Sequence, residues 1–313
     1  MTYSVTKLDP ARRYGLTIEG LTESDIKDES VRTALKQLWI EHGLIVFRGQ
    51  ASSTFHVELS KVFGPCDLHP VKETRIEQFP ELIEVRYEPK NEALYDVGGK
   101  QLGGWLPWHK DNIYVDRINH GGILRALTVP PEGGDTGFID QIEAYEALSD
   151  DVKARIEKLL VVYKMRMHFA DQRYASPVPI KLLRTCDFIE KVVARENNDF
   201  PLVVHPAVYR QERTGRPVLN ISPMFAEYIY GMDNAEGHEL LQHLVDHVSS
   251  SKFAFYHKWV VGEMVLWDNW RMLHSAEGVD PQATRWMRRT TIGGDYSLGR
   301  KLADLELQPA LPI

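Results

Sequence analysis

The stretch Trp105-Leu106-Pro107-Trp108-His109-Lys110-Asp111 (WLPWHKD) decides how the rest of this chain is interpreted. It ends in a His-x-Asp pair. Residues two apart in an extended segment point to the same side, so His109 and Asp111 face one way and Lys110 faces the other. Two imidazoles and one carboxylate on one face of an ion are typical of mononuclear non-haem iron centres. One short segment therefore supplies two of the three ligands that such a centre needs.

The third ligand has to come from a distant part of the chain. His274 ends the stretch 264–274 (MVLWDNWRMLH), whose apolar residues and central turn predict a strand, a turn and a second strand. Arg285 follows eleven residues later and offers a cation for an acidic cosubstrate. By itself, a His-x-Asp pair is more often part of an exposed turn. The prediction of a metal site depends on His109, Asp111, His274 and Arg285 occurring together.

Bulk composition predicts a folded protein and excludes several classes of function. Hydrophobic residues make up 43% of the 313 residues and charged residues 26%, close to the globular norm. The net charge of −7 and the lack of a long basic run argue against a nucleic-acid partner. No apolar stretch is long enough for a membrane span or a secretory signal, so we expect no membrane partner and a cytoplasmic location. Cys66 and Cys186 are widely separated, which favours two reduced thiols.

Local patterns predict a second half dominated by strands. We expect strands at 44–47, 82–87, 121–129, 137–140, 202–209, 218–221, 253–260, 264–267 and 286–292. Helical patterns occur at 30–42, 54–63, 142–148, 150–160, 180–195 and 236–249. The region from about residue 70 to Trp105 is typical of a surface loop system. No linker divides the chain, so we predict one domain over 1–313, mainly β with peripheral helices, as a β-sandwich or jelly roll.

Several motifs occur in the order and spacing of one known family. They are Trp108-His109-Lys110-Asp111, the turn Gly133-Gly134-Asp135-Thr136, Trp267-Asp268-Asn269, His274 and Arg285-x-x-x-Arg289. On these residues the chain, over about 44–296, resembles the taurine dioxygenase / 2,4-dichlorophenoxyacetate dioxygenase (TauD/TfdA) family. The resemblance implies a double-stranded β-helix (jelly roll, cupin-like) with active-site loop or lid segments around 70–105 and 164–200. It also implies an enzyme that uses Fe(II), O2 and 2-oxoglutarate, hydroxylates its substrate, and releases succinate and CO2.

The resemblance implies a role for each matched position. His109, Asp111 and His274 would be the iron ligands. Arg285 would bind the distal carboxylate of 2-oxoglutarate, helped by the hydroxyl of Thr136, since a guanidinium can hold a carboxylate through two parallel hydrogen bonds. Other interpretations exist: Arg285 alone is equally a surface ion-pair partner, and Thr136 is equally a residue that a tight turn uses.

Three further residues are candidates for the substrate pocket. His69 and Arg289 match family positions that contact the acidic group of the substrate, although His69 is equally a loop histidine and Arg289 equally part of a solvated basic edge. Trp105 departs from the small polar residue of the taurine enzymes, and an indole there would favour a larger apolar or aromatic substrate. The carboxylate of Asp111 favours hydroxylation, because related halogenases have a small residue at that position.

These residues predict a small anionic substrate, and several alternatives stay open. We expect a hydrophobic or aromatic carboxylate first, a sulfonate or alkyl sulfate second, and an amino-acid-derived metabolite third. A non-catalytic jelly-roll binding protein would have little reason to keep three iron ligands together with Arg285. A metal-dependent hydrolase would not need that arginine. Family members are often dimers or tetramers, so a homo-oligomer is an open expectation. The remaining histidines show no ligand spacing: His168, His205, His243, His247 and His257.

Overall fold

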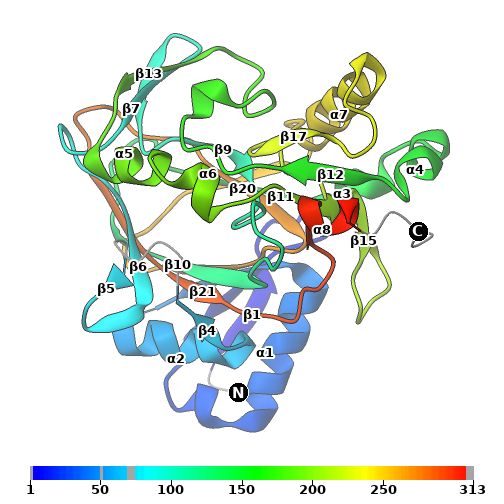
Figure 1. The fold of residues 1–313 in the computed structure, drawn as a ribbon. Helices are drawn as coiled ribbons and strands as arrows, with labels where there is room; N and C mark the ends of the chain where they lie inside the picture. Colours follow the sequence, from blue (N-terminus) through cyan, green and yellow to red (C-terminus); the bar gives the residue numbers. More distant parts are fainter. Residues whose placement is uncertain (1–2, 50–51, 69–74, 308–313) are drawn as a thin grey trace.

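The computed structural model describes residues 3–49, 52–68 and 75–307 (Figure 1). A large sheet has the strand order β1 (Ser4–Lys7), β2 (Leu16–Glu19), β3 (Leu44–Arg48), β19 (Met264–Asp268), β10 (Gly121–Thr128), β21 (Arg285–Ile292), β6 (Phe79–Tyr87) and β5 (Arg75–Ile76), with β4 (Cys66–Asp67) paired to β21. A second sheet has the order β18 (Ala254–His257), β11 (Thr136–Asp140), β20 (Met272–Ala276) and β9 (Leu106–His109). The two sheets form the jelly roll that the sequence predicts.

β3 shows how one strand serves two cores. Leu44 and Val46 pack between the two sheets, with Phe138 of β11 among their neighbours in that core. Ile45 and Phe47 belong to a second core, formed against α1 (Glu29–His42) and α2 (Ser53–Phe63). Because alternate residues of a strand face opposite sides, a strand covered on both faces has an unbroken apolar sequence. The prediction of a buried strand at 44–47 is confirmed.

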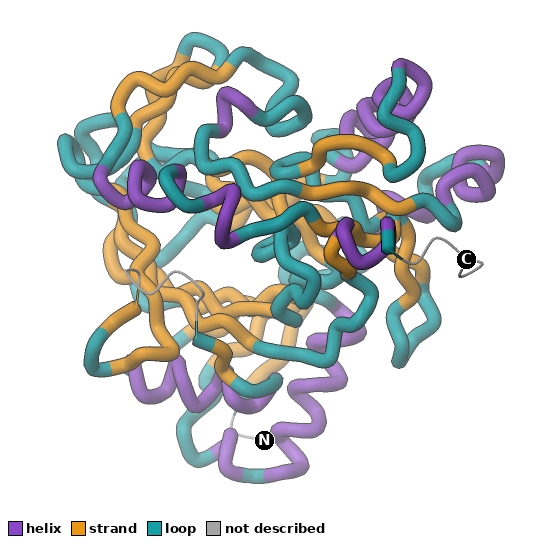
Figure 2. The backbone as a smooth tube through the Cα atoms, viewed as in Figure 1, coloured by secondary structure: helices purple, strands orange, loops and turns teal. Residues whose placement is uncertain are grey.

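Helices surround the sheets on the outside (Figure 2). α1 and α2 cover the outer face of the large sheet, at the bottom of Figure 1. The other helices are α3 (Gln141–Glu146), α4 (Asp150–Ile156), α5 (Asp187–Val193), α6 (Glu196–Asp199), α7 (Ala235–Val248) and α8 (Leu302–Glu306), with 3-10 turns at Asp25–Lys27 and Phe169–Asp171. Within the described ranges, none of the helices is both long enough and apolar enough to cross a membrane.

Smaller sheets extend the jelly roll at its edges. One has the order β17 (Ala226–Ile229), β12 (Leu160–Tyr163), β14 (Val203–Pro206) and β22 (Arg300–Lys301); another has the order β13 (Ile180–Arg184), β7 (Leu94–Val97) and β8 (Lys100–Gly103). β15 (Val208–Arg210) and β16 (Pro217–Leu219) form a two-stranded ribbon. The three-stranded sheet and α5 lie together at one end of the molecule (Figure 1).

Several local predictions are wrong. Residues 180–184 form β13 where a helix is expected, because pairing with β7 outweighs the helical preference of the Lys-Leu-Leu-Arg sequence. The stretch 202–209 is two strands, which pair with different partners and separate after Pro206. The helix expected at 150–160 ends at Ile156, and Leu160 already begins β12. The expected loop system contains a hairpin of β7 and β8, turned by Gly98 and Gly99 at φ values of 59° and 90°.

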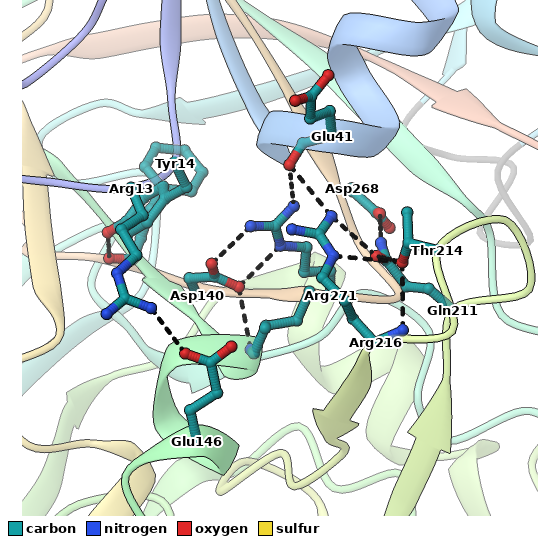
Figure 3. A network of polar contacts seen from close by, with 12 residues as sticks. Arg13, Tyr14, Glu41, Asp140, Glu146, Gln211, Thr214, Arg216, Asp268 and Arg271 are labelled. Atoms are coloured by element: carbon teal, nitrogen blue, oxygen red, sulfur yellow. Dashed lines mark hydrogen bonds and ion pairs between the residues drawn. The ribbon is translucent and has the colours of Figure 1, made fainter.

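A buried arginine fixes the turn between β19 and β20 (Figure 3). Arg271 is 2% exposed and donates to both carboxylate oxygens of Asp140, at 2.8 and 2.6 Å. Its third nitrogen donates to the carbonyl of Glu41, one of the last carbonyls of α1, at 2.9 Å. This bidentate pair ties β20 to β11 and to the end of α1. It holds the turn at residues 269–271, in which Asn269 contacts the backbone of Asp111.

Candidate metal centre

Cross-strand pairing brings the two candidate histidine ligands together. His109 is the last residue of β9 and lies opposite His274 of β20 in the strand register. Their ring centroids are 4.1 Å apart. Asp111 follows two residues after His109, and the ligand atoms of all three residues lie within 4.8 Å of one another. Among the described residues, this is the one group of three or more His, Cys, Asp or Glu side chains that could hold a metal ion.

The protonation of His109 suits a metal ligand. Its Nδ1 lies 2.7 Å from the carbonyl of Pro107, so this nitrogen carries the proton and donates it. Nε2 is then left with its lone pair, 3.9 Å from Oδ1 of Asp111. Burial and the neighbouring His274 lower the pKa of His109 to about 3. The imidazole is therefore neutral at physiological pH, the form that binds metals.

The two carboxylate oxygens of Asp111 differ in their hydrogen bonding. Nη1 of Arg289 donates to Oδ1 at 2.6 Å, whereas Oδ2 is buried and has no hydrogen-bond partner among the described residues. Burial by itself raises the pKa of Asp111, but the attraction of Arg289 and His274 lowers it well below its usual range. A buried carboxylate oxygen without a partner is costly unless a cation satisfies it. Two imidazole nitrogens and this oxygen fit a divalent iron ion.

The turn between β19 and β20 holds the backbone of the His-x-Asp segment. Asn269 accepts a hydrogen bond from the backbone N–H of Asp111 at 2.8 Å. Its side-chain amide donates to the carbonyls of Asp111 and Asn119, at 3.0 and 3.1 Å. Asn269 is fully buried, so these bonds are protected from water. The motif Trp-Asp-Asn marks this position in the sequence, but its contact with the metal segment was not predictable from spacing.

Lys110 points away from the ligands, as the alternation of an extended segment predicts. Its ammonium nitrogen is completely buried and donates to Oδ1 of Asn220 at 2.7 Å and to the carbonyl of Trp270 at 2.6 Å. Burial lowers the pKa of Lys110 to about 7, although Asp268 raises it. Lys110 therefore anchors the segment on the side opposite the ligands.

Arg285 and Thr136 form a second polar cluster; Thr136 pairs with Ala276 of β20, two residues after the candidate ligand His274. Nη2 of Arg285 donates to Oγ1 of Thr136 at 3.1 Å, and Nε donates to the carbonyl of Gly134 at 3.0 Å. Burial lowers the pKa of Arg285 to about 10, so it stays a cation. The indole N–H of Trp259 also donates to Oγ1 of Thr136, at 2.9 Å. Because this oxygen accepts twice, its own O–H is left to donate to a third group, such as a carboxylate.

A cavity of about 690 Å³ opens from the His-x-Asp segment. Its wall includes His109, Asp111, Arg289 and Trp105. The remaining wall is largely apolar and aromatic, and includes Leu106, Met165, Met167, Phe169, Phe188, Ile189, Val192, Met224 and Phe225. Both segments expected to form lids, 70–105 and 164–200, contribute residues to it; their motion stays a prediction. A volume of this size suits a small-molecule ligand.

The structure places most of the predicted site residues together. His109, Asp111 and His274 cluster, Thr136 contacts Arg285, and both Trp105 and Arg289 line the cavity. The interpretation of Arg289 as a solvated edge is wrong, because the residue is 9% exposed and bonded to Asp111. His69 lies outside the described residues. The sequence did not suggest Trp259 as a partner of Thr136, because only the pairing of distant strands brings the two together.

Comparison with known proteins yields similar chains over almost the whole length. The family model described as "Taurine catabolism dioxygenase TauD, TfdA family" matches residues 4–291. The (S)-phenoxypropionate/alpha-ketoglutarate-dioxygenase of Sphingobium herbicidovorans is 29% identical over 302 residues, which cover 96% of this chain and 98% of that protein. The alpha-ketoglutarate-dependent 2,4-dichlorophenoxyacetate dioxygenase of Cupriavidus pinatubonensis is 29% identical over 287 residues, covering 88% of this chain and 94% of that protein.

Solved structures share the fold. The crystal structure of AAD-2 in complex with Mn(II) and N-oxalylglycine has a TM-score of 0.70 at 22% identity, covering 95% of this chain and all of that one. At this level of identity the likeness shows the architecture alone. The jelly roll deduced from the sheet order is therefore also the fold of a known protein.

Proposed function

The chain belongs to the taurine catabolism dioxygenase TauD, TfdA family, and from this premise we propose that it hydroxylates an anionic substrate with a hydrophobic or aromatic body, most plainly an aromatic carboxylate. The enzyme is a 2-oxoglutarate-dependent non-haem iron dioxygenase. The observation that carries the proposed substrate is the cavity at the metal ligands, where a buried arginine faces a wall of aromatic and aliphatic side chains.

We assign His109, Asp111 and His274 as the iron ligands. When bound, Fe(II) and 2-oxoglutarate supply the oxidising chemistry, in which O2 is consumed, 2-oxoglutarate becomes succinate and CO2, and a substrate C–H bond is hydroxylated. The protein holds its ligands in advance: Pro107 sets the tautomer of His109, and Asn269 fixes the backbone of Asp111. These contacts reduce the rearrangement that metal binding requires.

We assign Arg285 and Thr136 to the distal carboxylate of 2-oxoglutarate. The guanidinium is buried and positively charged, and it is held in place by Gly134 and Thr136. The free O–H of Thr136 and the remaining guanidinium N–H groups can donate to one carboxylate together. Holding that end of the molecule would leave its keto-acid end free to bind the metal.

We assign Arg289 and Trp105 to the substrate. Of the described residues, three arginines line the cavity: Arg75, Arg86 and Arg289. Arg289 is the buried one and is bonded to Asp111, so it is suited to attract the acidic group of a molecule bound near the candidate ligands. Trp105 packs edge-to-face on Phe169, with ring centroids 6.0 Å apart, and these two cavity-lining rings offer aromatic contacts to an aromatic body. His69 remains a candidate for the same acidic group.

A sulfonate or alkyl sulfate is the second candidate substrate. A guanidinium binds the planar carboxylate and the tetrahedral sulfonate through the same N–H donors, so Arg289 does not discriminate between them. The size and aromatic character of the cavity favour a larger body than that of a small amino sulfonate. The two candidates differ in the anion, and a direct substrate comparison separates them.

The function is tested by succinate formation in the presence of Fe(II), 2-oxoglutarate and a substrate panel. The panel contains phenoxyacetate, hexanoate, taurine and hexyl sulfate, and Asp111→Ala is the control. We expect phenoxyacetate to stimulate succinate release most strongly, and the variant to show none. If hexyl sulfate or taurine alone stimulated succinate release, the acidic group of the substrate would be a sulfate or sulfonate and not a carboxylate. If the visible band of the Fe(II)–2-oxoglutarate chelate failed to form under anaerobic conditions, the assignment of both binding sites would be wrong.

We extend the proposal to a cytoplasmic enzyme that acts on a free small molecule as a homo-oligomer. Cell fractionation tests the location, and sedimentation velocity tests the oligomeric state. Recovery in the membrane fraction, or sedimentation as a monomer at micromolar concentration, would contradict the respective part.

A further inference from the structure

Tyr95 lines the substrate cavity and carries a buried hydroxyl group without a partner among the described residues. The residue lies on β7, in the three-stranded sheet, and is 3% exposed. Its hydroxyl oxygen is buried and has no hydrogen-bond partner among the described residues. Tyr95 also lines the cavity that begins at His109 and Asp111. A buried hydroxyl without a partner is unusual in folded proteins and calls for an explanation.

Two other tyrosines of the same wall have satisfied hydroxyl groups. The hydroxyl of Tyr114 donates to Oδ1 of Asn112 at 3.1 Å, and that of Tyr87 donates to the carbonyl of Pro281 at 3.1 Å. These two groups are occupied within the protein. Among the described tyrosines of the wall, Tyr95 therefore differs in having a buried hydroxyl without a partner inside the protein.

The ring of Tyr95 is held rigidly, so its hydroxyl has a defined position. It stacks on Phe169 with ring centroids 5.0 Å apart and lies 6.4 Å from the ring of Trp105. Burial raises the pKa of Tyr95, so the phenol keeps its proton and can donate it. A fixed donor costs little conformational entropy when it forms a hydrogen bond.

The ring neighbours of Tyr95 are Trp105 and Phe169, the thiol of Cys186 is also nearby, and the sheet of Tyr95 is separate from that of Arg289. Phe169, Phe188 and Val192 lie in the same wall, whereas Arg289 belongs to β21 of the large sheet. A purely hydrocarbon ring bound here would leave the hydroxyl unpaired, at a cost of about 1–3 kcal/mol. A ring with a polar substituent would satisfy it.

We propose that Tyr95 is a specificity-determining residue, whose hydroxyl donates a hydrogen bond to a polar substituent on the body of the substrate, while Arg289 attracts the acidic group. This inference rests on the proposed aromatic carboxylate substrate and makes it more specific. The preferred substrate is an aromatic acid with a second polar group on its ring, such as a hydroxyl or a keto oxygen.

The experiment compares matched probes that differ by one ring hydroxyl. Phenoxyacetate, 3-hydroxyphenoxyacetate and 4-hydroxyphenoxyacetate are titrated into the protein, and dissociation constants are measured by calorimetry, which does not depend on turnover. The variants are Tyr95→Phe and, as a matched control from the same wall, Tyr114→Phe. The quantity compared is the ratio of the affinity for each hydroxylated probe to the affinity for phenoxyacetate.

We expect the wild-type protein to prefer at least one hydroxylated probe, and Tyr95→Phe to lower that ratio by about five- to tenfold, the effect of one neutral hydrogen bond. Tyr114→Phe should leave the ratio unchanged. The inference about Tyr95 would be wrong if Tyr95→Phe changed the ratio for neither isomer, or if the wild-type protein preferred neither hydroxylated probe. The proposed aromatic substrate would still stand in that case. If no probe bound the wild-type protein, the proposed aromatic substrate would fail as well.

Thermal unfolding provides an independent readout. Replacing an unpaired buried hydroxyl by hydrogen removes a desolvation cost, so Tyr95→Phe should unfold at the wild-type temperature or above it. Tyr114→Phe removes a hydrogen bond and should unfold at a lower temperature. A fall of several degrees for Tyr95→Phe would mean that the hydroxyl is satisfied inside the folded protein, which contradicts the inference.

Discussion

Nη1 of Arg289 lies 2.6 Å from Oδ1 of Asp111, so an arginine of the cavity wall is bonded directly to the carboxylate of the candidate metal site. Asp111 and Arg289 are each more than nine-tenths buried. The pair links Asp111, which follows β9, to the large sheet through β21. It also means that any anion bound by Arg289 would lie close to the candidate iron ligands.

Arg289→Met should make metal binding more sensitive to acid. Burial raises the pKa of Asp111 and Arg289 is the strongest influence that lowers it, so the pKa should rise when the arginine is lost. Protons would then compete with the metal at higher pH. Mn(II) affinity is measured between pH 4 and 8. The pH below which the affinity falls should be higher for Arg289→Met than for the wild-type protein.

The matched control is Arg288→Met, on the same strand. Arg288 contacts Ser53 and Glu84 instead of the metal cluster. The pH below which Mn(II) affinity falls should be the same for Arg288→Met and the wild-type protein. The same pH for Arg289→Met and wild type would mean that the contact with Asp111 does not influence metal binding.

Trp259→Phe should weaken 2-oxoglutarate binding without slowing the reaction at saturation. The indole N–H orients Thr136 by occupying one acceptor position of its hydroxyl. Without that hydrogen bond, the Thr136 O–H can rotate away from the cosubstrate. We expect KM for 2-oxoglutarate to rise about fivefold and kcat to change little.

Trp286→Phe serves as the comparison, because its indole nitrogen is buried and has no partner among the described residues. Steady-state kinetics at varied 2-oxoglutarate concentration measure both variants. An equal rise of KM in both would point to general disturbance of the sheet, and an unchanged KM for Trp259→Phe would refute the orienting role.

Asn269→Ala should destabilise the fold as well as the metal site. The variant leaves the N–H of Asp111 and the carbonyls of Asp111 and Asn119 without their partner in a buried region. We expect a loss of about 2–4 kcal/mol in the free energy of unfolding, measured with urea on metal-free protein. Asn198→Ala, at the surface on α6, is the control. A loss below about 0.5 kcal/mol would show that the hydrogen bonds of Asn269 contribute little to stability.

His56→Gln should reduce the acid sensitivity of the fold. Burial lowers the pKa of His56 to about 3, against about 6.5 in an unfolded chain. Between these values the unfolded state binds more protons, so the stability present above pH 6.5 is lost as the pH falls toward 3. His205, with its pKa lowered to about 4 by burial, acts in the same direction.

The size of this effect follows from the pKa difference. From pH 7 to pH 5, protonation of His56 in the unfolded state costs about 2 kcal/mol of stability. Urea unfolding at the two pH values should show His56→Gln losing about that much less than wild type. His243→Gln, at an exposed position of α7, is the control. Parallel losses in His56→Gln and wild type would contradict the prediction.

Local sequence determined the elements whose burial pattern is complete within one segment. The apolar run at Leu44–Phe47 identified β3, and the periodic apolar residues before Gly43 identified α1. Residues 180–184 and the hairpin of β7 and β8 were missed, since their strands are stabilised by pairing with each other. Strand preference depends on partners, which a local pattern does not contain.

The candidate site divides in the same way. The sequence by itself determined the kind of chemistry, because His109, Asp111, His274 and Arg285 are few, reactive and recognisable by type and order. Only the tertiary structure decided that His274 pairs opposite His109, that Arg289 bonds Asp111, and that the hydroxyl of Tyr95 stays unpaired in the cavity wall. These relationships join residues up to 178 positions apart. They follow from strand register and packing, which depend on the whole chain at once.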